Sequence, residues 1–296
     1  TSWSAVRRIF VAMRDVGLLL KFRLAFTVVF SAAAGYLLGA PAFVWSEFLL
    51  LTLGGFAIVG SSNAFNQIWE IERDAVMERT KNRPLPSGRM KKPEAYAWAF
   101  TLGVAGTIAL GYLNVATAAF GLLSLLIYVL AYTPMKAHSP WAVLVGAFPG
   151  AIPFLLGWVA VTGDFGIESG TLFAIQFIWQ FPHFWAIAWV GYMDYAKAGY
   201  YLLPTGQKDR TATFLSVVYT IWMLLVSIMP AFGITGALTL SLPATAVVLI
   251  LGLDVLFHAW KHHQGPDDGS ARKLMFATIR YLPLLQLTYV IDHFLA

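Results

Sequence analysis

Long apolar stretches separated by short polar loops dominate the chain. Each stretch is about 20 residues long, which suits a bilayer-spanning helix better than an alternating barrel strand of about ten residues. Helices also satisfy every backbone polar group internally, as hydrocarbon requires. The nine predicted segments are 17–40, 45–68, 94–113, 115–133, 141–162, 168–192, 212–233, 238–259 and 273–294.

Composition identifies lipid as the main solvent. Of 296 residues, 58% are hydrophobic and 12% are charged, and the mean hydropathy is +0.68. A soluble domain carries about 25% charged residues. We therefore predict an all-α, polytopic membrane helix bundle with about nine transmembrane helices, forming one domain over residues 1–296. Cysteine is absent, which excludes disulfides, thiolate metal sites and cysteine nucleophiles.

The positions of the charges predict the orientation in the membrane. Lys and Arg gather before the first segment and in the loops after the second, fourth, sixth and eighth segments, while the opposite loops have none. This positive-inside pattern places the N-terminus and those loops in the cytoplasm and the C-terminus outside. It also accounts for the net charge of +5 without nucleic acid. Residues 1–15 form a cytoplasmic N-terminal segment, able to make a short surface helix, and no clear signal-peptide cleavage site follows.

A row of polar residues ends the second segment. If the helix continues, Asn66, Glu70 and Asp74 lie at i, i+4 and i+8 on one face. Amide and carboxylate oxygens are ligands that Mg²⁺ accepts together with substrate phosphates. Basic residues that could neutralise a diphosphate follow at Arg79, Lys81 and Arg83. The plain alternative, loop charges that obey the positive-inside rule, does not explain polar groups inside an apolar helix, where they are costly.

Two further groups of residues carry possible chemistry. After the sixth segment, Asp194 could hold a metal ion and Lys197 could meet phosphate, unless the two are a solvated loop pair. His183 lies within that segment among aromatic residues, where a hydrogen-bonded structural role is equally open. Lys136, after the fourth segment, is either a phosphate contact or an anchor. The Gly/Pro-rich stretch 146–157 predicts a distorted helix with room for a bulky group or close packing.

Several ordered motifs resemble the membrane-embedded aromatic prenyltransferases, and within them the branch that farnesylates protohaem IX. The row at Asn66, Glu70 and Asp74 is similar to the Asn-x-x-x-Asp-x-x-x-Asp motif of the superfamily. The resemblance to the haem branch is carried by residues 77–85, 132–136, 146–158, 180–185, 194–199 and 271–285. Two positions depart from the general pattern: Glu70 replaces the usual Asp, and Ala198 stands where a second Asp-x-x-x-Asp motif would have its second acid.

The resemblance implies a nine-helix bundle in a bacterial inner membrane that transfers farnesyl from farnesyl diphosphate to a vinyl group of protohaem IX. It implies Mg²⁺ as cofactor, haem as a substrate, and a role in haem A and terminal oxidase biogenesis, with haem A synthase as a candidate partner. Asn66, Glu70, Asp74 and Asp194 would bind metal, and Lys197 would join them in catalysis. His183 would orient or ligate haem. The expected diphosphate contacts are Arg23, Arg79, Lys81, Arg83 and Lys136.

Rival functions remain open at this point. A related prenyltransferase acting on a quinone-precursor ring would share the metal motif but has less reason for the haem-branch motifs. A transporter would place paired polar signals near the membrane midplane. Here the acids gather at one face beside a basic loop. A structural membrane scaffold would need neither feature.

Overall fold

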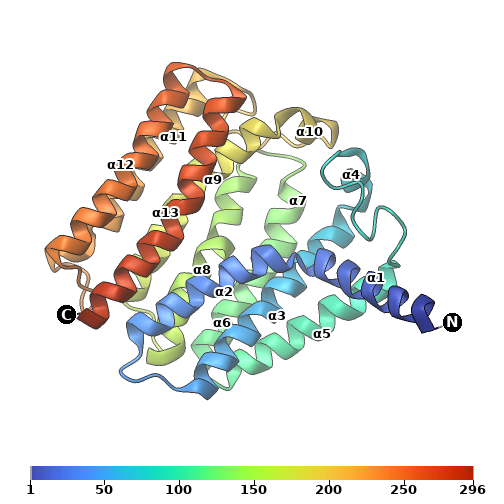
Figure 1. The fold of residues 1–296 in the computed structure, drawn as a ribbon, viewed down its shortest axis with the longest axis horizontal. Helices are drawn as coiled ribbons and strands as arrows, with labels where there is room; N and C mark the ends of the chain where they lie inside the picture. Colours follow the sequence, from blue (N-terminus) through green and yellow to red (C-terminus); the bar gives the residue numbers. More distant parts are fainter. Residues whose placement is uncertain (1, 296) are drawn as a thin grey trace.

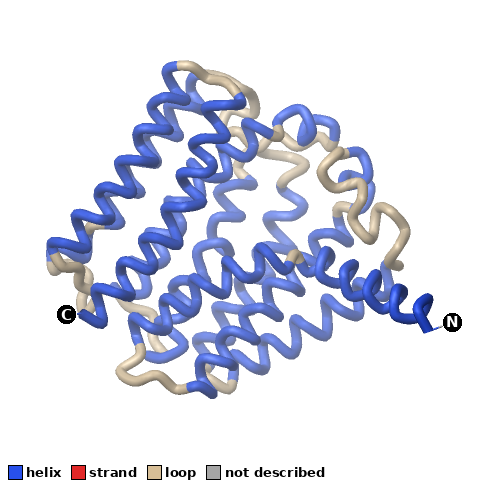
Figure 2. Tube along the Cα trace, viewed as in Figure 1, coloured by secondary structure: helices blue, strands red, loops and turns tan. Residues whose placement is uncertain are grey.

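The computed structural model describes residues 2–295, apart from the side chains of residues 2–5 and 8. The described residues are helical throughout, with turns and loops but no strand (Figure 2). The helices are α1 (Ser2–Leu20), α2 (Phe22–Gly39), α3 (Trp45–Trp69), α4 (Ile71–Val76), α5 (Lys92–Gly111), α6 (Val115–Leu126), the π-helix η1 (Ile127–Tyr132), α7 (Thr133–Met135), α8 (Ala142–Thr162), α9 (Ile167–Val190), α10 (Tyr192–Lys197), α11 (Arg210–Ser227), the 3₁₀-helix η2 (Met229–Phe232), α12 (Leu242–Gln264) and α13 (Asp268–Leu295).

Within residues 2–295, a long helix or continuous helical run lies on each of the nine predicted segments, with some ends shifted. The run Val115–Met135 counts as one of them, because α6, η1 and α7 follow without a break. Seven of these helices are long and apolar enough to cross a membrane: α2, α3, α6–α7, α8, α11, α12 and α13. The predicted all-helical membrane architecture is therefore confirmed, with seven candidate spans.

The centre of the bundle is the close packing of α2 against α8. A Cβ built on Gly157 of α8 would lie 2.0 Å from the carbonyl oxygen of Ala32, and one on Gly35 of α2 would lie 2.1 Å from that of Phe154. Only glycine allows two helix backbones to approach this closely, as small residues do between membrane helices. Around this pair, α3, α5 and α6 pack on one side, and α9 with α11, α12 and α13 on the other (Figure 1).

The joint between α1 and α2 is sharper than the sequence predicts. The first apolar segment was expected to begin at residue 17, but α1 runs to Leu20 and the chain turns at Lys21, whose φ of 52° is left-handed. Side chains of α3 satisfy the carbonyls left free at the end of α1: the Gln67 amide donates to Leu18 and Leu19, and the Asn63 amide donates to Leu20. These bonds hold a strained lysine in a defined position.

Candidate functional site

A cavity of about 440 Å³ lies inside the bundle, beside the end at which α3 and α9 finish. Polar and charged side chains line its outer part, which we call the mouth. Tyrosine, proline, glycine and neutral polar residues line the part further in, which we call the chamber. The mouth consists of Lys21, Asn66, Glu70, Asp74, Arg79, Arg83 and Lys136, and the chamber includes Tyr128, Pro149, Gly150, Pro153, Gln180, His183 and Phe184.

The predicted polar row exists, although the helix that carries it is interrupted. α3 ends at Trp69 and α4 begins at Ile71, yet the Glu70 N–H bonds to the Asn66 carbonyl at 3.1 Å and the Asp74 N–H to the Glu70 carbonyl at 2.7 Å. The helical i to i+4 connection therefore passes through the break. As a result all three side chains of the row are buried and face the same cavity.

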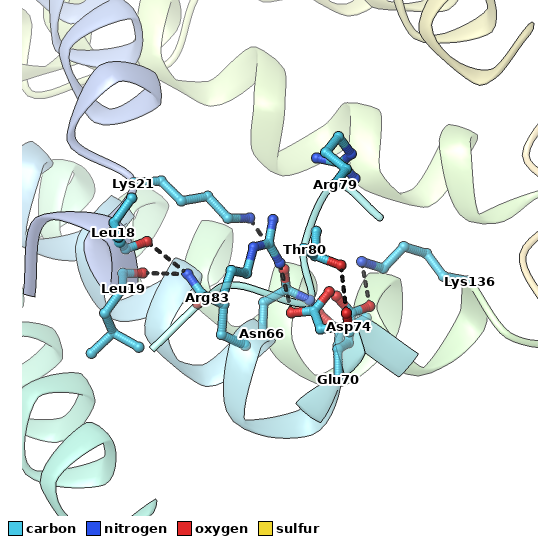
Figure 3. Close-up of polar contacts among 12 residues, drawn as sticks. Leu18, Leu19, Lys21, Asn66, Glu70, Asp74, Arg79, Thr80, Arg83 and Lys136 are labelled. Carbon is cyan, nitrogen blue, oxygen red and sulfur yellow. Dashed lines mark hydrogen bonds and ion pairs between the residues drawn. The ribbon is translucent and has the colours of Figure 1, made fainter. Parts of the chain in front are cut away.

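Basic side chains meet each member of this row (Figure 3). Glu70 forms an ion pair with Lys136 and accepts a 2.8 Å hydrogen bond from the Tyr200 hydroxyl. Asp74 pairs with Arg83 at 2.7 Å. Lys21 lies 3.4 Å from the amide oxygen of Asn66. Buried charges need such partners, because an unpaired one would cost several kcal/mol.

The mouth has oxygen atoms suited to a divalent cation. One carboxylate oxygen of Asp74, Oδ1, is buried and has no hydrogen-bond partner among the described residues. The Asn66 amide oxygen accepts a hydrogen bond from no described group other than the Lys21 ammonium, at 3.4 Å. In residues 2–295, however, no three His, Asp or Glu side chains already converge as a metal cage. This donor set fits Mg²⁺, which usually takes one or two carboxylates and completes its shell with water and phosphate.

Asp194 and Lys197 lie outside the lining of this cavity. The Asp194 carboxylate instead accepts the backbone N–H groups of Glu78 at 2.8 Å and Arg79 at 3.2 Å, and Lys197 lies 3.7 Å from it. Partial burial raises the pKa of Asp194, but the two N–H donors and the nearby cations lower it further, so it ends below its ordinary value. Asp194 thus anchors the loop that carries Arg79. The two polar regions that the sequence singled out, one after α3 and one after α9, are therefore in direct contact.

The predicted basic residues separate into two groups. Arg79, Arg83 and Lys136 line the mouth. Arg23 is exposed on α2 outside the cavity lining, and Lys81 is exposed and pairs with Glu78 at 2.5 Å. At the start of α2, the cation that faces the cavity is Lys21, because the left-handed turn directs it toward Asn66.

Within the chamber, His183 is fixed by one contact from α13 and one from its own helix, α9. Its Nδ1 lies 2.9 Å from the Thr278 hydroxyl of α13, and its ring stacks on Trp179 at 4.7 Å between centroids. Gln180, one turn of α9 away, donates to the backbone carbonyls of Ala147 and Gln176. A Cβ on Gly150 would lie 1.9 Å from the Gln180 amide oxygen, so the predicted Gly/Pro stretch makes room for this side chain.

Sequence reasoning gave no role to several lining residues: Lys21, Tyr128, Tyr132, Gln180 and Tyr200. One signal was available, because Tyr128, Tyr132 and Lys136 repeat the four-residue spacing of the row in α3. The π-helix over Ile127–Tyr132 lies on this repeat, and such turns are frequent at functional sites.

Comparison with known proteins extends over nearly the whole chain. Residues 28–280 match the model of the UbiA prenyltransferase family. A protoheme IX farnesyltransferase of Christiangramia forsetii is 50% identical over 275 residues, which is 93% of this chain and 92% of that protein. A protein of the same name from Flavobacterium johnsoniae is 47% identical over 294 residues, covering 98% and 97%.

Solved structures show the same fold at low identity. A digeranylgeranylglyceryl phosphate synthase superposes with a TM-score of 0.78 at 18% identity, covering 96% of this chain and 99% of that one. A UbiA homologue from Archaeoglobus fulgidus bound to GPP and Mg²⁺ gives 0.67 at 13% identity, covering 94% and 99%. The family model over residues 28–280 and the 50% identical relative show that the chain belongs to the UbiA prenyltransferase family.

Proposed function

We propose that this enzyme transfers the farnesyl group of farnesyl diphosphate to a vinyl group of protohaem IX, which yields haem O. The structural observation that carries the proposal is one cavity with two unlike parts. Its mouth holds cations and hard oxygen ligands, and its chamber holds aromatic rings with a histidine. The relatives named protoheme IX farnesyltransferase, at 47% and 50% identity, support haem as the acceptor.

The diphosphate belongs in the mouth. Arg79, Arg83, Lys136 and Lys21 would bind its oxygens, with Arg83 able to make two parallel hydrogen bonds. Asn66, Glu70 and Asp74 would hold Mg²⁺, which neutralises charge on the leaving group. The Asp74 Oδ1 atom, which no described residue hydrogen-bonds, supports this assignment. So does the Archaeoglobus fulgidus relative, whose structure contains both GPP and Mg²⁺ in the same fold.

The remaining chemistry takes place in the chamber. When the allylic C–O bond breaks, diphosphate leaves with the bonding electrons and a farnesyl cation remains. The rings of Tyr128, Tyr132 and Phe184 can stabilise that cation and keep water from it. A haem vinyl carbon then attacks, and water adds to the neighbouring carbon with loss of a proton, which leaves a hydroxyethylfarnesyl group. His183 is the side chain we assign to orienting haem.

We also propose nine membrane crossings with the N-terminus inside. α3 ends at Trp69, next to Glu70, and α7 ends beside Lys136, which pairs with Glu70. The intervening α5 must therefore return across the bundle, and its 20 residues span about 30 Å. The same reasoning applies to the 24 residues of α9, which lead from the far end of α8 back to Asp194. The basic loops then face the cytoplasm.

The biological setting follows from the chemistry. Bacterial relatives and the positive-inside pattern support the bacterial inner membrane, with the mouth at the cytoplasmic face. The product is more apolar than the substrate and remains in the bilayer. Direct delivery to the next membrane enzyme, haem A synthase, is therefore part of the proposal.

A product assay tests the proposal. Purified protein in nanodiscs is incubated with farnesyl diphosphate, Mg²⁺ and protohaem, or with a quinone-precursor aromatic acceptor in place of protohaem. Mass spectrometry should show protohaem gaining farnesyl and water, and EDTA should abolish the product. Prenylation of the quinone precursor with no change in haem would overturn the assignment of the acceptor, and product formation without divalent metal would overturn the role of the mouth.

A further inference from the structure

His183 is held by a hydrogen bond whose direction can be worked out. Thr278, fully buried on α13, places its hydroxyl oxygen 2.9 Å from His183 Nδ1 and 2.7 Å from the carbonyl oxygen of Met275. A hydroxyl has one proton, and a carbonyl can only accept. Both contacts are hydrogen bonds at once only if the hydroxyl donates to Met275 and accepts from His183. The imidazole proton is then on Nδ1.

The opposite ring nitrogen is left with a free lone pair. His183 lines the cavity, and among the described residues nothing forms a hydrogen bond to its Nε2. The ring cannot turn easily, because Trp179 stacks on it at an interplanar angle of 15°. Trp179 is itself held by a 2.8 Å bond from its indole N–H to the Thr278 carbonyl. A single residue of α13 thus fixes both the histidine and the ring that supports it.

We propose that Thr278 is a positioning residue that holds His183 in the Nδ1–H tautomer, so that Nε2 ligates the iron of the porphyrin substrate. The inference rests on the proposed function for the identity of that substrate and extends it by naming the ligating atom and the group that orients it. Neutral imidazole is a common iron ligand. A hydrogen-bond acceptor at its other nitrogen fixes the ring and increases its basicity. Seven residues separate His183 from the end of α9, so the iron would lie about 10 Å inside the mouth end.

The tautomer is tested without any substrate. Nitrogen-15 spectra of the histidine side chains distinguish a protonated Nδ1 from a protonated Nε2, and the His183→Gln spectrum identifies the signal among the six histidines. Wild type and Thr278→Ser should show protonated Nδ1, whereas Thr278→Val, which has no acceptor, should lose this preference. An Nε2-protonated His183 in the wild type would overturn the proposal whatever the enzyme's activity.

Iron ligation is tested with protohaem alone. Thr278→Val should weaken haem binding about tenfold, in the range for loss of a group that orients a metal ligand, and Thr278→Ser should stay within about twofold of wild type. The iron–histidine stretch of the ferrous complex in resonance Raman spectra should fall in frequency in Thr278→Val. A structural role alone would not move that band.

A second threonine-to-valine substitution on the same helix controls for general effects of this change on the protein. Among the described residues, the side chain of Thr288 on α13 bonds only to the carbonyl of Leu284 in its own helix, so Thr288→Val should match wild type in all three measurements. An unchanged iron–histidine band in Thr278→Val would overturn the positioning role of Thr278. Persistence of the band in His183→Gln would overturn ligation by His183 Nε2. Failure to farnesylate haem in a protein that keeps the band would instead count against the proposed function.

Discussion

Acidic side chains at the mouth have basic partners, whereas polar side chains in the chamber are neutral and bond to carbonyls or a hydroxyl. Glu70 and Asp74 pair with Lys136 and Arg83. Gln180 and His183 bond to Ala147 and Thr278. The ion pairs at the mouth can open when a metal cation and a diphosphate anion bind together. The cation then pairs with the acidic side chains and the anion with the basic ones, so no buried charge is left without a partner. Bonds between neutral groups and a packed scaffold fix one shape. The mouth is thus built to exchange ions and the chamber to hold a rigid ring.

The largest expected effect comes from disabling the exchange at the mouth. Asp74→Asn removes the charge of a buried carboxylate whose Oδ1 has no hydrogen-bond partner in the part of the chain that the structure describes. We expect farnesyl transfer to fall about 10³-fold, as for the loss of a preorganised electrostatic group, while haem binding changes little. Initial rates by mass spectrometry and a haem titration measure the two separately. Glu72→Gln, an exposed neighbour on α4, is the matched control and should stay near wild type.

The reverse result is expected in the chamber. His183→Ala should weaken haem binding about 100-fold, because a ligand to the iron is lost, while Mg²⁺-dependent release of diphosphate from farnesyl diphosphate persists. Optical titration and a phosphate-release assay report the two functions. If both fell together, the separation of mouth and chamber would be wrong. If neither changed, His183 would have no part in binding haem.

The rigidity of the chamber is tested by filling its wall. Gly150→Ala places a methyl group 1.9 Å from the Gln180 amide oxygen, so Gln180 must give up its bonds to Ala147 and Gln176. We expect a loss of about 2 kcal/mol in stability from overpacking, together with weaker haem binding. At Gly55, an added Cβ would meet no described residue within 4 Å apart from the adjoining part of its own helix, so Gly55→Ala should be neutral or slightly stabilising. Thermal unfolding in one detergent compares the two variants.

The two parts also differ in how far the sequence predicted them. The polar row in the mouth could be predicted from its four-residue spacing. The side chains keep that spacing on one face although the helix is interrupted, because the backbone hydrogen bonds of Glu70 and Asp74 continue across the break. The chamber depends on contacts between distant helices, such as His183 with Thr278, which are 95 residues apart. No local pattern encodes such a pair. The position of Asp194 was likewise out of reach, because its partners are backbone N–H groups of another loop.

The joint at Lys21 provides the last test, and the smallest expected effect. A lysine in the left-handed region carries no local signal, since glycine or asparagine is usual there, and so Arg23 was predicted as the cation at this end of α2. Lys21→Asn keeps a residue that tolerates this backbone conformation and removes the ammonium group. We expect kcat/KM for farnesyl diphosphate to fall about tenfold, equivalent to about 1.4 kcal/mol from one lost charge-assisted contact. Arg23→Gln should change it less than about twofold, because that side chain is exposed outside the cavity lining. Steady-state kinetics at saturating haem compare the two variants. A larger loss of kcat/KM in Arg23→Gln than in Lys21→Asn would show that the diphosphate approaches along the outer face of α2. The mouth would then include residues beyond those that line the cavity.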